Sequence, residues 1–190
     1  MVRIVAPRPI AFVSTLNAEG RGNLAPFSFF NAGGHSPPSC VISCGRDRHG
    51  RTKHTLDNIE VTHEYVINVC TRELAERINK TSFEYPPDVD EFDVAGFTRA
   101  PSLRVKPPRV AESPIQLECK LFQIIPHGPA GPGQSNYIIG EIVMIHAAES
   151  VCVDGIPDER LVHLVARMGA DRWMEVRDDA VFPLPRPTSP

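Results

Sequence analysis

The apolar residues in the first half of the chain are grouped into short segments, and residues typical of turns separate these segments. Residues 17–23 form one such separator, rich in asparagine and glycine. Pro26 interrupts the second apolar segment, because proline cannot donate a hydrogen bond to a sheet. The predicted strands cover residues 10–16, 24–31, 39–44 and 65–70.

A longer hairpin is predicted in the second half. Apolar and polar residues alternate from Ile115 to Leu121 within the segment 115–125, which is the period of a strand with one buried face. The apolar segment 136–146 follows after a stretch rich in glycine and proline, residues 126–135. We therefore expect the two segments to pair as antiparallel strands.

Helices are predicted where a capping residue precedes apolar residues three or four apart. Thr55 is the expected N-cap of the first helix, and Asn58 is its expected capping-box partner. The last helix is expected to begin after Asp158 and to end at Gly169. The other two are a helix at Glu73–Lys80 capped by Thr71, and a short helix within 90–97 that ends at Gly96.

The chain as a whole favours one mainly β domain over residues 1–176. Its 19 prolines are about twice the usual share of roughly 5%, and strands do not alternate regularly with helices. We expect a closed or partly closed antiparallel barrel with a few accessory helices, since closure removes exposed strand edges. Residues 85–114 are expected to cross the surface, and residues 177–190 to form a flexible tail.

Charge and composition exclude several classes of partner. The formal net charge is −3, so there is no general basic surface for nucleic acid. No apolar run reaches the length of about 20 residues that spans a membrane, and no signal-peptide pattern is present, so we expect a cytoplasmic protein. The 5 cysteines and 7 histidines have no zinc-site spacing, which predicts reduced thiols and no metal.

A local cluster of cations stands out against this balance. The segment 45–59, GRDRHGRTKHTLDNI, contains Arg46, Arg48, Arg51 and Lys53 immediately before a predicted helix. Backbone N–H groups and the helix dipole favour an anion at such a position, and arginine and lysine side chains would add hydrogen bonds to a phosphate. The alternative is a solvated basic loop, since charge runs are usually surface features.

The usual signatures of phosphate chemistry are missing elsewhere. No G-x-G-x-x-G motif follows a predicted strand, and no G-x-S-x-G motif is present. Phosphate binding without a hydrolytic motif indicates a phosphorylated cofactor that brings its own reactivity.

Six segments, in this order and spacing, resemble the flavin reductase-like family of FMN-binding split barrels. The resemblance extends from about residue 8 to residue 176 and implies a Greek-key split-barrel fold. It also implies a homodimer with FMN in a groove at the subunit interface. The segments are RPIAFVSTL (8–16), NLAPFSFFN (23–31), PPSCVISC (37–44), RTKHTLDNI (51–59), SNYIIGEIV (135–143) and ARMGADRW (166–173).

The resemblance also implies which residues bind FMN. At least one of Phe27, Phe29 and Phe30 must pack in the core or at the dimer contact, because strand residues alternate between faces. An equally simple role for Ser28 is a hydrogen bond to a neighbouring backbone group. Arg46 and Arg48 are expected to be surface charges. The implied contacts are Arg51, Lys53 and Thr55 to the phosphate, Ser14 and Thr15 lining the groove, Ser28, Phe29, Phe30 and Asn31 along the isoalloxazine edge and ribityl chain, and Ser43 and Cys44 facing the same groove.

The sequence departs from the family pattern at two places. His54 replaces the acid of the usual K-D-T, and Ala170 and Trp173 replace a glycine and a tyrosine near the C-terminal end. Arg167 and Trp173 are therefore weak site candidates, and a helix C-terminal position is the simpler account of Arg167.

The resemblance implies an FMN-dependent reductase with NADH or NADPH as hydride donor and an oxygenase or other electron acceptor as partner. His127 is a candidate contact for the nicotinamide, or simply an exposed loop residue. A second hypothesis is a flavoredoxin-like electron carrier or flavin-storage protein that does not use nicotinamide. A third is a split barrel that has lost flavin, which retention of Arg51, Lys53 and Thr55 disfavours.

Overall fold

The computed structural model of the protein describes residues 1–188. Strands account for 40% of the chain and helices for 16%, which confirms the prediction of a mainly β protein. In this part of the chain no helix has the length and apolar character needed to span a membrane. The last two residues of the predicted tail, 189–190, lie outside the described residues.

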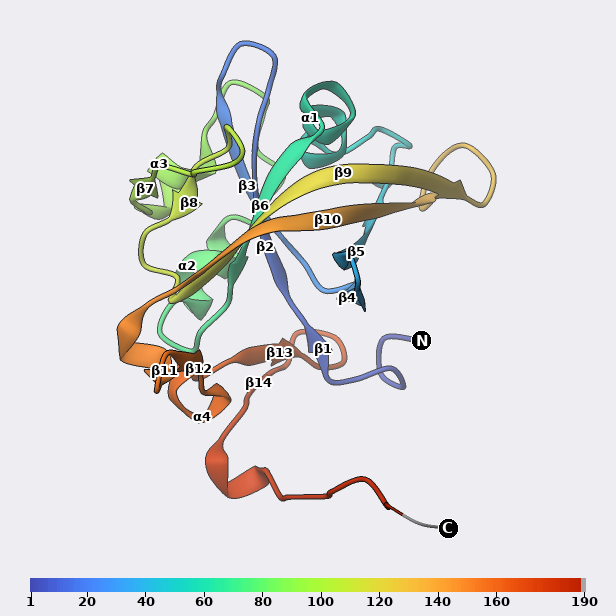
Figure 1. Ribbon diagram of the computed structural model, residues 1–190. Helices are drawn as coiled ribbons and strands as arrows, with labels where there is room; N and C mark the ends of the chain where they lie inside the picture. Colours follow the sequence, from blue (N-terminus) through green and yellow to red (C-terminus); the bar gives the residue numbers. More distant parts are fainter. Residues whose placement is uncertain (189–190) are drawn as a thin grey trace.

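The centre of the molecule is one seven-stranded antiparallel sheet with the order β3-β2-β6-β9-β10-β5-β4 (Figure 1). Its two longest strands are β9 and β10, which form the predicted hairpin. The strands are β2 (Ala11–Leu16), β3 (Gly22–Phe27), β4 (Phe30–His35), β5 (Pro38–Gly45), β6 (Glu64–Val69), β9 (Ile115–His127) and β10 (Ser135–Ala147).

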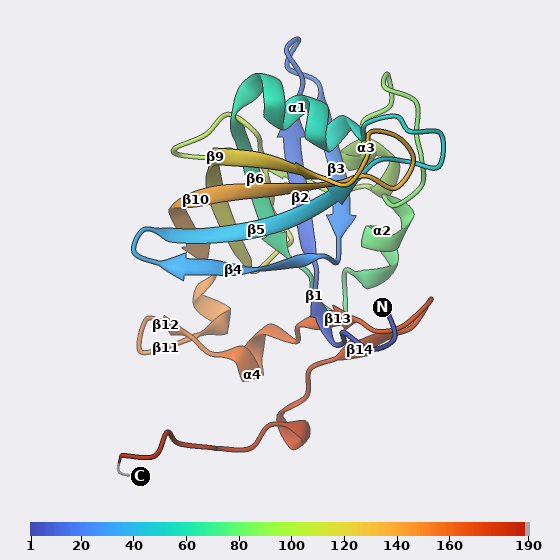
Figure 2. The same ribbon diagram turned by 90° about the vertical axis from the view of Figure 1, so that its right-hand side faces the viewer.

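The sheet curls strongly but does not close. In Figure 2, β9, β10, β5 and β4 run across the direction of β3, β2 and β6. The end strands β3 and β4 are not paired with each other, so a closed barrel is not present in the described residues. β3 comes close to β5 on this side, and the backbone N–H of Ser43 on β5 donates to the carbonyl of Phe29, in the break between β3 and β4, at 2.7 Å. The result is an antiparallel barrel with an open side next to β3 and β5.

Most predicted strands are confirmed, but the predicted strand at 24–31 is wrong as a single element. It is divided into β3, which ends at Phe27, and β4, which begins at Phe30. The two strands lie at opposite ends of the sheet. The short break between them therefore carries the chain across the opening of the barrel.

The first helix, α1 (His54–Thr62), has a different start from the one predicted. Its N-cap residue is Lys53, and no side chain caps this end. The hydroxyl of Thr55 instead accepts a hydrogen bond from the Asn23 amide at 2.9 Å, and the Asn58 amide donates to Thr15 at 2.9 Å. The predicted Thr55 cap is wrong because tertiary partners take these side chains.

The other helices are short. α2 (Ala75–Lys80) begins two residues later than predicted, and α3 (Glu91–Ala95) ends at Gly96 in the left-handed conformation, as predicted. Asp158 caps α4 (Glu159–Val162), as predicted, but this helix ends at His163 instead of Gly169. The 3-10 turns are η1 (Glu149–Val151) and η2 (Asp178–Ala180).

The predicted long last helix is wrong beyond residue 163. Val165–Arg167 forms β13, which pairs with β1 on one side and β14 on the other. The backbone N–H of Val165 also donates to the carbonyl of Cys70. Strand pairing therefore outcompetes the helical periodicity here. The remaining strands are β1 (Arg8–Pro9), β7 (Arg99–Ala100), β8 (Arg109–Val110), β11 (Cys152–Val153), β12 (Ile156–Pro157) and β14 (Trp173–Glu175).

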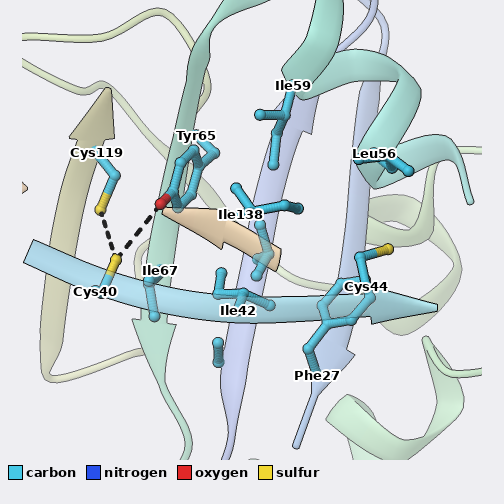
Figure 3. Close-up of a cluster of buried hydrophobic side chains, with 12 residues drawn as sticks. Phe27, Cys40, Ile42, Cys44, Leu56, Ile59, Tyr65, Ile67, Cys119 and Ile138 are labelled. Atoms are coloured by element: carbon cyan, nitrogen blue, oxygen red, sulfur yellow. Dashed lines mark hydrogen bonds between the residues drawn. The ribbon is translucent and has the colours of Figure 1, made fainter. Parts of the chain in front are cut away.

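Two hydrophobic clusters stabilise the sheet from its two faces. The inner cluster, drawn in Figure 3, fills the barrel and includes Val13 and Tyr65. The outer cluster includes Phe12 and packs beneath α2, α3 and β8. Because successive residues of β2 point to opposite faces, both faces of this strand are buried.

The segment 85–114 is not simply a surface excursion, which corrects the prediction. Phe92 and Val110 of this segment are fully buried in the outer cluster. The fully buried carboxylate of Glu118 on β9 accepts hydrogen bonds from the backbone N–H groups of Leu103, Arg104 and Val105, at 2.6 to 3.1 Å. A single buried acid thus holds the loop 103–105 against the sheet.

Glu118 makes folding stability dependent on pH. Burial raises the pKa of this carboxyl, but the hydrogen bonds from the Leu103 N–H and from His146, at 2.6 Å, outweigh burial and lower it. A group with a lowered folded-state pKa stabilises the fold above its unfolded-state pKa, and this contribution is lost in acid. We expect Glu118→Gln to lower the free energy of unfolding by about 2 kcal/mol at pH 7.

Urea titrations between pH 7 and pH 3 test this expectation. The difference between the wild type and Glu118→Gln should shrink below about pH 4, where the free carboxyl is protonated. Glu141→Gln, at an exposed position of β10, is the matched control. A difference that stays constant with pH would contradict a role for the ionised carboxylate.

Candidate functional site

The open side of the barrel contains a cavity of about 550 Å³. Most of its lining comes from β3 with the break that follows it, from the loop between β5 and α1 together with the start of α1, and from the segment 81–87 after α2. Ser43 of β5 and Glu91 of α3 complete the lining. Its volume lies within the range of about 300–1,000 Å³ usual for sites that bind small molecules. The cavity therefore coincides with the place where the sheet fails to close.

One wall of the cavity carries two of the predicted cations. Arg51 and Lys53 both line it, and no ion pair or hydrogen bond within residues 1–188 involves the Lys53 ammonium group. Arg51 is 69% exposed in its side chain and pairs with Asp47 at 2.7 Å. Desolvation would raise the pKa of Asp47, but its hydrogen bonds from Arg51 and His49 lower the pKa to about 2. Arg51 is thus partly neutralised, and Lys53 is the cation available to a ligand.

The N-terminus of α1 opens on the same wall. Because no side chain caps it, its first backbone N–H groups remain available to an anion. Lys53 at the N-cap and the positive end of the helix dipole add to this field. Cation, dipole and free N–H groups meet in one place.

A buried polar network supports this helix end from behind. The Asn23 amide donates to Thr55 at 2.9 Å and to Thr15 at 3.4 Å, and Asn58 donates to Thr15 at 2.9 Å. Asn23 and Thr55 line the cavity, whereas Thr15 is fully buried behind them. The network therefore fixes α1 against β2 and β3.

Another part of the lining, the segment 81–87, contributes two aromatic rings. The rings of Phe83 and Tyr85 meet edge to face, with centroids 5.0 Å apart, and Phe83 is 68% exposed. The buried carboxyl of Glu91 also lines the cavity and accepts from the Leu24 N–H at 2.9 Å. Burial raises the pKa of Glu91. The cavity thus combines a cationic wall with a wall suited to planar rings.

The cavity brings together six of the eleven residues implied by the family resemblance. Phe29 is 42% exposed, whereas Phe27 is mostly buried and packs in the inner core. The expectation that at least one of the neighbouring phenylalanines packs in the core is confirmed, and Phe27 contributes to the cavity lining as well. The six residues are Ser28, Phe29, Ser43, Arg51, Lys53 and Thr55.

Ser43 and Cys44 do not face the same groove, which corrects the prediction. Side chains on a strand alternate, so Ser43 points to the cavity while Cys44 is fully buried in the inner cluster (Figure 3). Burial raises the pKa of the Cys44 thiol to about 12. Cys44 is therefore a neutral packing residue of the core.

Ser14, Thr15, Phe30 and Asn31 are also not among the residues that line the cavity. The Ser14 hydroxyl is buried and donates to the Pro108 carbonyl at 2.6 Å. Phe30 packs on the inner cluster from β4. The side-chain oxygen of Asn31 accepts from the Ala32 N–H. Ser14 and Thr15 are fully buried and do not line this cavity, so the structure does not bring them to the position that the family resemblance implies.

Several lining residues were not found from the sequence. Asn23 lies in a segment that resembles the family, but no feature of the sequence marks this residue as part of a site. Glu91 stands in the first turn of a predicted helix, where acidic residues are common for structural reasons. Phe83 and Tyr85 lie in a stretch without periodicity. Their position in the cavity depends on tertiary contacts.

The remaining candidates lie away from this cavity. His127 is exposed at the end of β9, with its ring 5.8 Å from that of Tyr137. Arg167 is on β13, not at a helix C-terminus, and its guanidinium lies 5.6 Å from the centre of the Trp173 ring. Arg46 is partly buried and donates to Gln134 and to the Gly50 carbonyl, so it is not merely a surface charge. Arg48 is exposed, as predicted.

An uncapped helix end, a cation and exposed aromatic rings meet in one cavity. Residues 1–157 match the flavin reductase like domain, so the chain belongs to the flavin reductase-like family. The resemblance found in the sequence is thereby confirmed.

Relatives and solved structures agree with this assignment. An uncharacterized protein of Halalkalibacterium halodurans is 36% identical over 99% of this chain and 90% of its own length. Component B of nitrilotriacetate monooxygenase from Bacillus cereus superposes with a TM-score of 0.90 at 29% identity, covering 96% of this chain and 90% of that one. The 2-nitrobenzoate 2-nitroreductase of Pseudomonas fluorescens has a TM-score of 0.85 at 32% identity, covering 97% and 88%.

Proposed function

We propose that the protein binds FMN in the cavity and is an NAD(P)H-dependent flavin reductase. The observation that carries this proposal is the meeting of Lys53 with the uncapped N-terminus of α1 inside a cavity of the flavin reductase-like fold. A phosphate there would receive charge-assisted hydrogen bonds from Lys53 and Arg51. The Thr55 hydroxyl, which accepts from Asn23, keeps its own hydrogen to donate.

The residues present fit the rest of FMN. Ser28 and Ser43 offer polar groups at the split in the barrel, and Phe29 offers an exposed ring. Bound FMN would supply the hydride and single-electron chemistry that side chains lack. The protein would orient the ring system, exclude water and hold the phosphate, so no acid–base residue is required. This agrees with the absence of a hydrolytic motif from the sequence.

The acceptor of the electrons is a separate part of the proposal. By its name, the Bacillus cereus protein is one component of a monooxygenase, and the Pseudomonas fluorescens protein reduces an aromatic nitro group. These names support an oxygenase or a small aromatic acceptor as the partner of this chain. A cytoplasmic location stays a prediction from the sequence.

The second candidate function is an FMN-binding electron carrier or storage protein. It is favoured by one observation: His127, the side chain considered for the nicotinamide, does not line the cavity. A carrier would need the same phosphate site and no nucleotide contact.

Anaerobic visible spectra separate the two candidates. The protein is mixed with one equivalent of FMN, and NADH and then NADPH are added. We expect the bound-flavin band to bleach much faster than free FMN treated in the same way, with one nucleotide preferred. A bound-flavin spectrum that neither nucleotide bleaches would favour the electron carrier, and no bound-flavin spectrum would refute both.

A homodimer, implied by the family resemblance, is also proposed. Large apolar side chains are exposed along the β9–β10 hairpin, including Phe122 at 73%, Ile145 at 56% and Ile125 at 40%. Burying them against a second copy would remove apolar surface from water. Sedimentation equilibrium should give twice the mass of one chain, and a monomer at micromolar concentration would contradict the proposal.

A further inference from the structure

A second cavity, of about 450 Å³, adjoins the proposed FMN site. The two cavities share Pro26, Ser28, Phe29 and Ser82 in their linings, so the break after β3 forms a common wall. The other side of the second cavity is formed by β1, β13 and β14. A ligand in this cavity would therefore be next to the flavin site without occupying the phosphate end.

Arg8 on β1 lines this second cavity and is a buried cation without a counter-charge. Arg8 is only 6% exposed, and it forms no ion pair within residues 1–188. Its terminal nitrogens donate to the carbonyls of Val2, Val5 and Met168, at 2.7 to 3.1 Å. Buried charges in proteins are normally paired, because carbonyl dipoles only partly replace hydration. Arg8 therefore lacks an anion.

The hydrogen-bond inventory supports this conclusion independently. The Nε atom of Arg8 is the one buried side-chain nitrogen or oxygen in the described chain that has no hydrogen-bond partner. Arginine is a donor only, so the missing partner must be an acceptor. Arg8 lines the second cavity although its Nε atom is itself buried, so an anion in the cavity would compensate the charge of the guanidinium without bonding to Nε directly.

A second cation and two aromatic rings complete the cavity. The Arg167 side chain is 26% exposed and donates to the Ala170 carbonyl at 2.6 Å. Its guanidinium is 3.6 Å from the fully exposed carboxylate of Asp171, which also lines the cavity, and this distance and exposure leave the ion pair weak. Trp173 lies beside Arg167, and the Phe29 ring lies 5.6 Å from the Arg8 guanidinium. Two arginines and two apolar rings fit an anionic group attached to a planar ring.

We propose that this cavity, named here the Arg8–Arg167 subsite, binds a planar organic anion that exchanges electrons with the flavin. The anionic group is a carboxylate or a phosphate, held by Arg8 and Arg167, and its ring lies toward Phe29 and the FMN site. The ligand is either the acceptor molecule, with a carboxylate, or the nicotinamide dinucleotide, with phosphates. Its redox role rests on the proposed function, whereas anion binding does not.

Trp173 provides a direct test, because it is the only tryptophan of the chain. Its fluorescence is followed in the full-length protein without flavin during titration with benzoate, with neutral benzamide, and with NAD⁺, which carries phosphates but cannot deliver hydride. We expect saturable binding of benzoate or NAD⁺ and affinity for benzamide at least about tenfold lower than for benzoate. Binding of benzoate but not NAD⁺ would indicate that the ligand of the subsite is an acceptor with a carboxylate. Binding of NAD⁺ would indicate that the ligand is the nicotinamide dinucleotide.

Two arginine variants make the test specific. Arg167→Gln should weaken anion binding about tenfold or more, while Arg104→Gln, at an exposed arginine outside the subsite, should leave it unchanged. Arg8→Gln should act in the same direction, but it also removes hydrogen bonds to the N-terminal segment. Its folding is therefore checked by circular dichroism, and Arg167→Gln keeps the test decisive.

Three results would overturn the proposal: no response to either anion, equal binding of benzamide and benzoate, or unchanged anion affinity in Arg167→Gln. The first result would also be seen if a carboxylate of a second copy already pairs with Arg8, and it would overturn the proposal in that case too. FMN binding is measured separately by its visible spectrum. FMN binding without anion binding refutes only the subsite, and anion binding without FMN binding refutes only the proposed function.

Discussion

Replacing Lys53 by methionine is expected to weaken FMN binding by about 10- to 100-fold. The substitution removes the ammonium group but keeps the apolar stem, and a hydrogen bond from a charged donor contributes about 1.5–3 kcal/mol. Lys53 has the largest expected effect on this site because Arg51 already shares its charge with Asp47. Quenching of FMN fluorescence at constant ionic strength measures the dissociation constant.

Arg48→Met is the matched control for this experiment. Arg48 belongs to the same basic loop, but it is exposed and does not line the cavity. It should leave FMN affinity within about twofold of the wild type, since exposed charges at a distance are screened by salt. Equal loss in both variants would mean that general loop charge attracts FMN, and unchanged affinity in Lys53→Met would refute the phosphate assignment.

Gly140→Ala is expected to lower the free energy of unfolding by about 3 kcal/mol or more. Gly140 lies in the centre of β10, opposite Cys40 on β5. A Cβ atom there would collide with the Tyr65 hydroxyl and come within 2.8 Å of the Tyr65 Cζ atom. Tyr65 is fully buried and its hydroxyl is 3.4 Å from the Cys40 sulfur, so the ring has no room to withdraw (Figure 3).

Chemical denaturation of single and double variants tests this interpretation. Combining Gly140→Ala with Tyr65→Phe should cost less than the sum of the two single changes, because the phenylalanine lacks the colliding oxygen. Gly34→Ala, on the exposed edge strand β4, meets only the Ser39 hydroxyl at 3.5 Å and should change stability little. Additive costs would show that Tyr65 is not the obstacle.

Local patterns predicted the elements that depend on neighbouring residues. The hairpin of β9 and β10, the strands β2, β5 and β6, and the end of α3 at Gly96 follow from apolar runs, alternation and turn residues. Such patterns fail where a distant partner competes. Residues 165–167 continue a helical stripe in the sequence, yet β1 and β14 recruit them into a sheet.

The candidate site divides in the same way. The cations Arg51 and Lys53 and the start of α1 are close together in the chain, so the sequence alone predicts their clustering. The alternation of residues along β5 also predicts that Ser43 and Cys44 point to opposite faces of the strand, although the family resemblance placed both in one groove. In contrast, Phe83 and Tyr85 reach the cavity only because the segment after α2 returns to the open side of the barrel.

Residue types and short spacings suffice to predict the mainly β class, the family and the cation pair at a helix start. Only the folded chain shows that the sheet stays open between its end strands β3 and β4, that Asn23 supports Thr55, and that Arg8 is buried beside a cavity. Arg8 and its partner Met168 are 160 residues apart. Contacts over such separations are set by how the whole sheet curls, which no local pattern encodes.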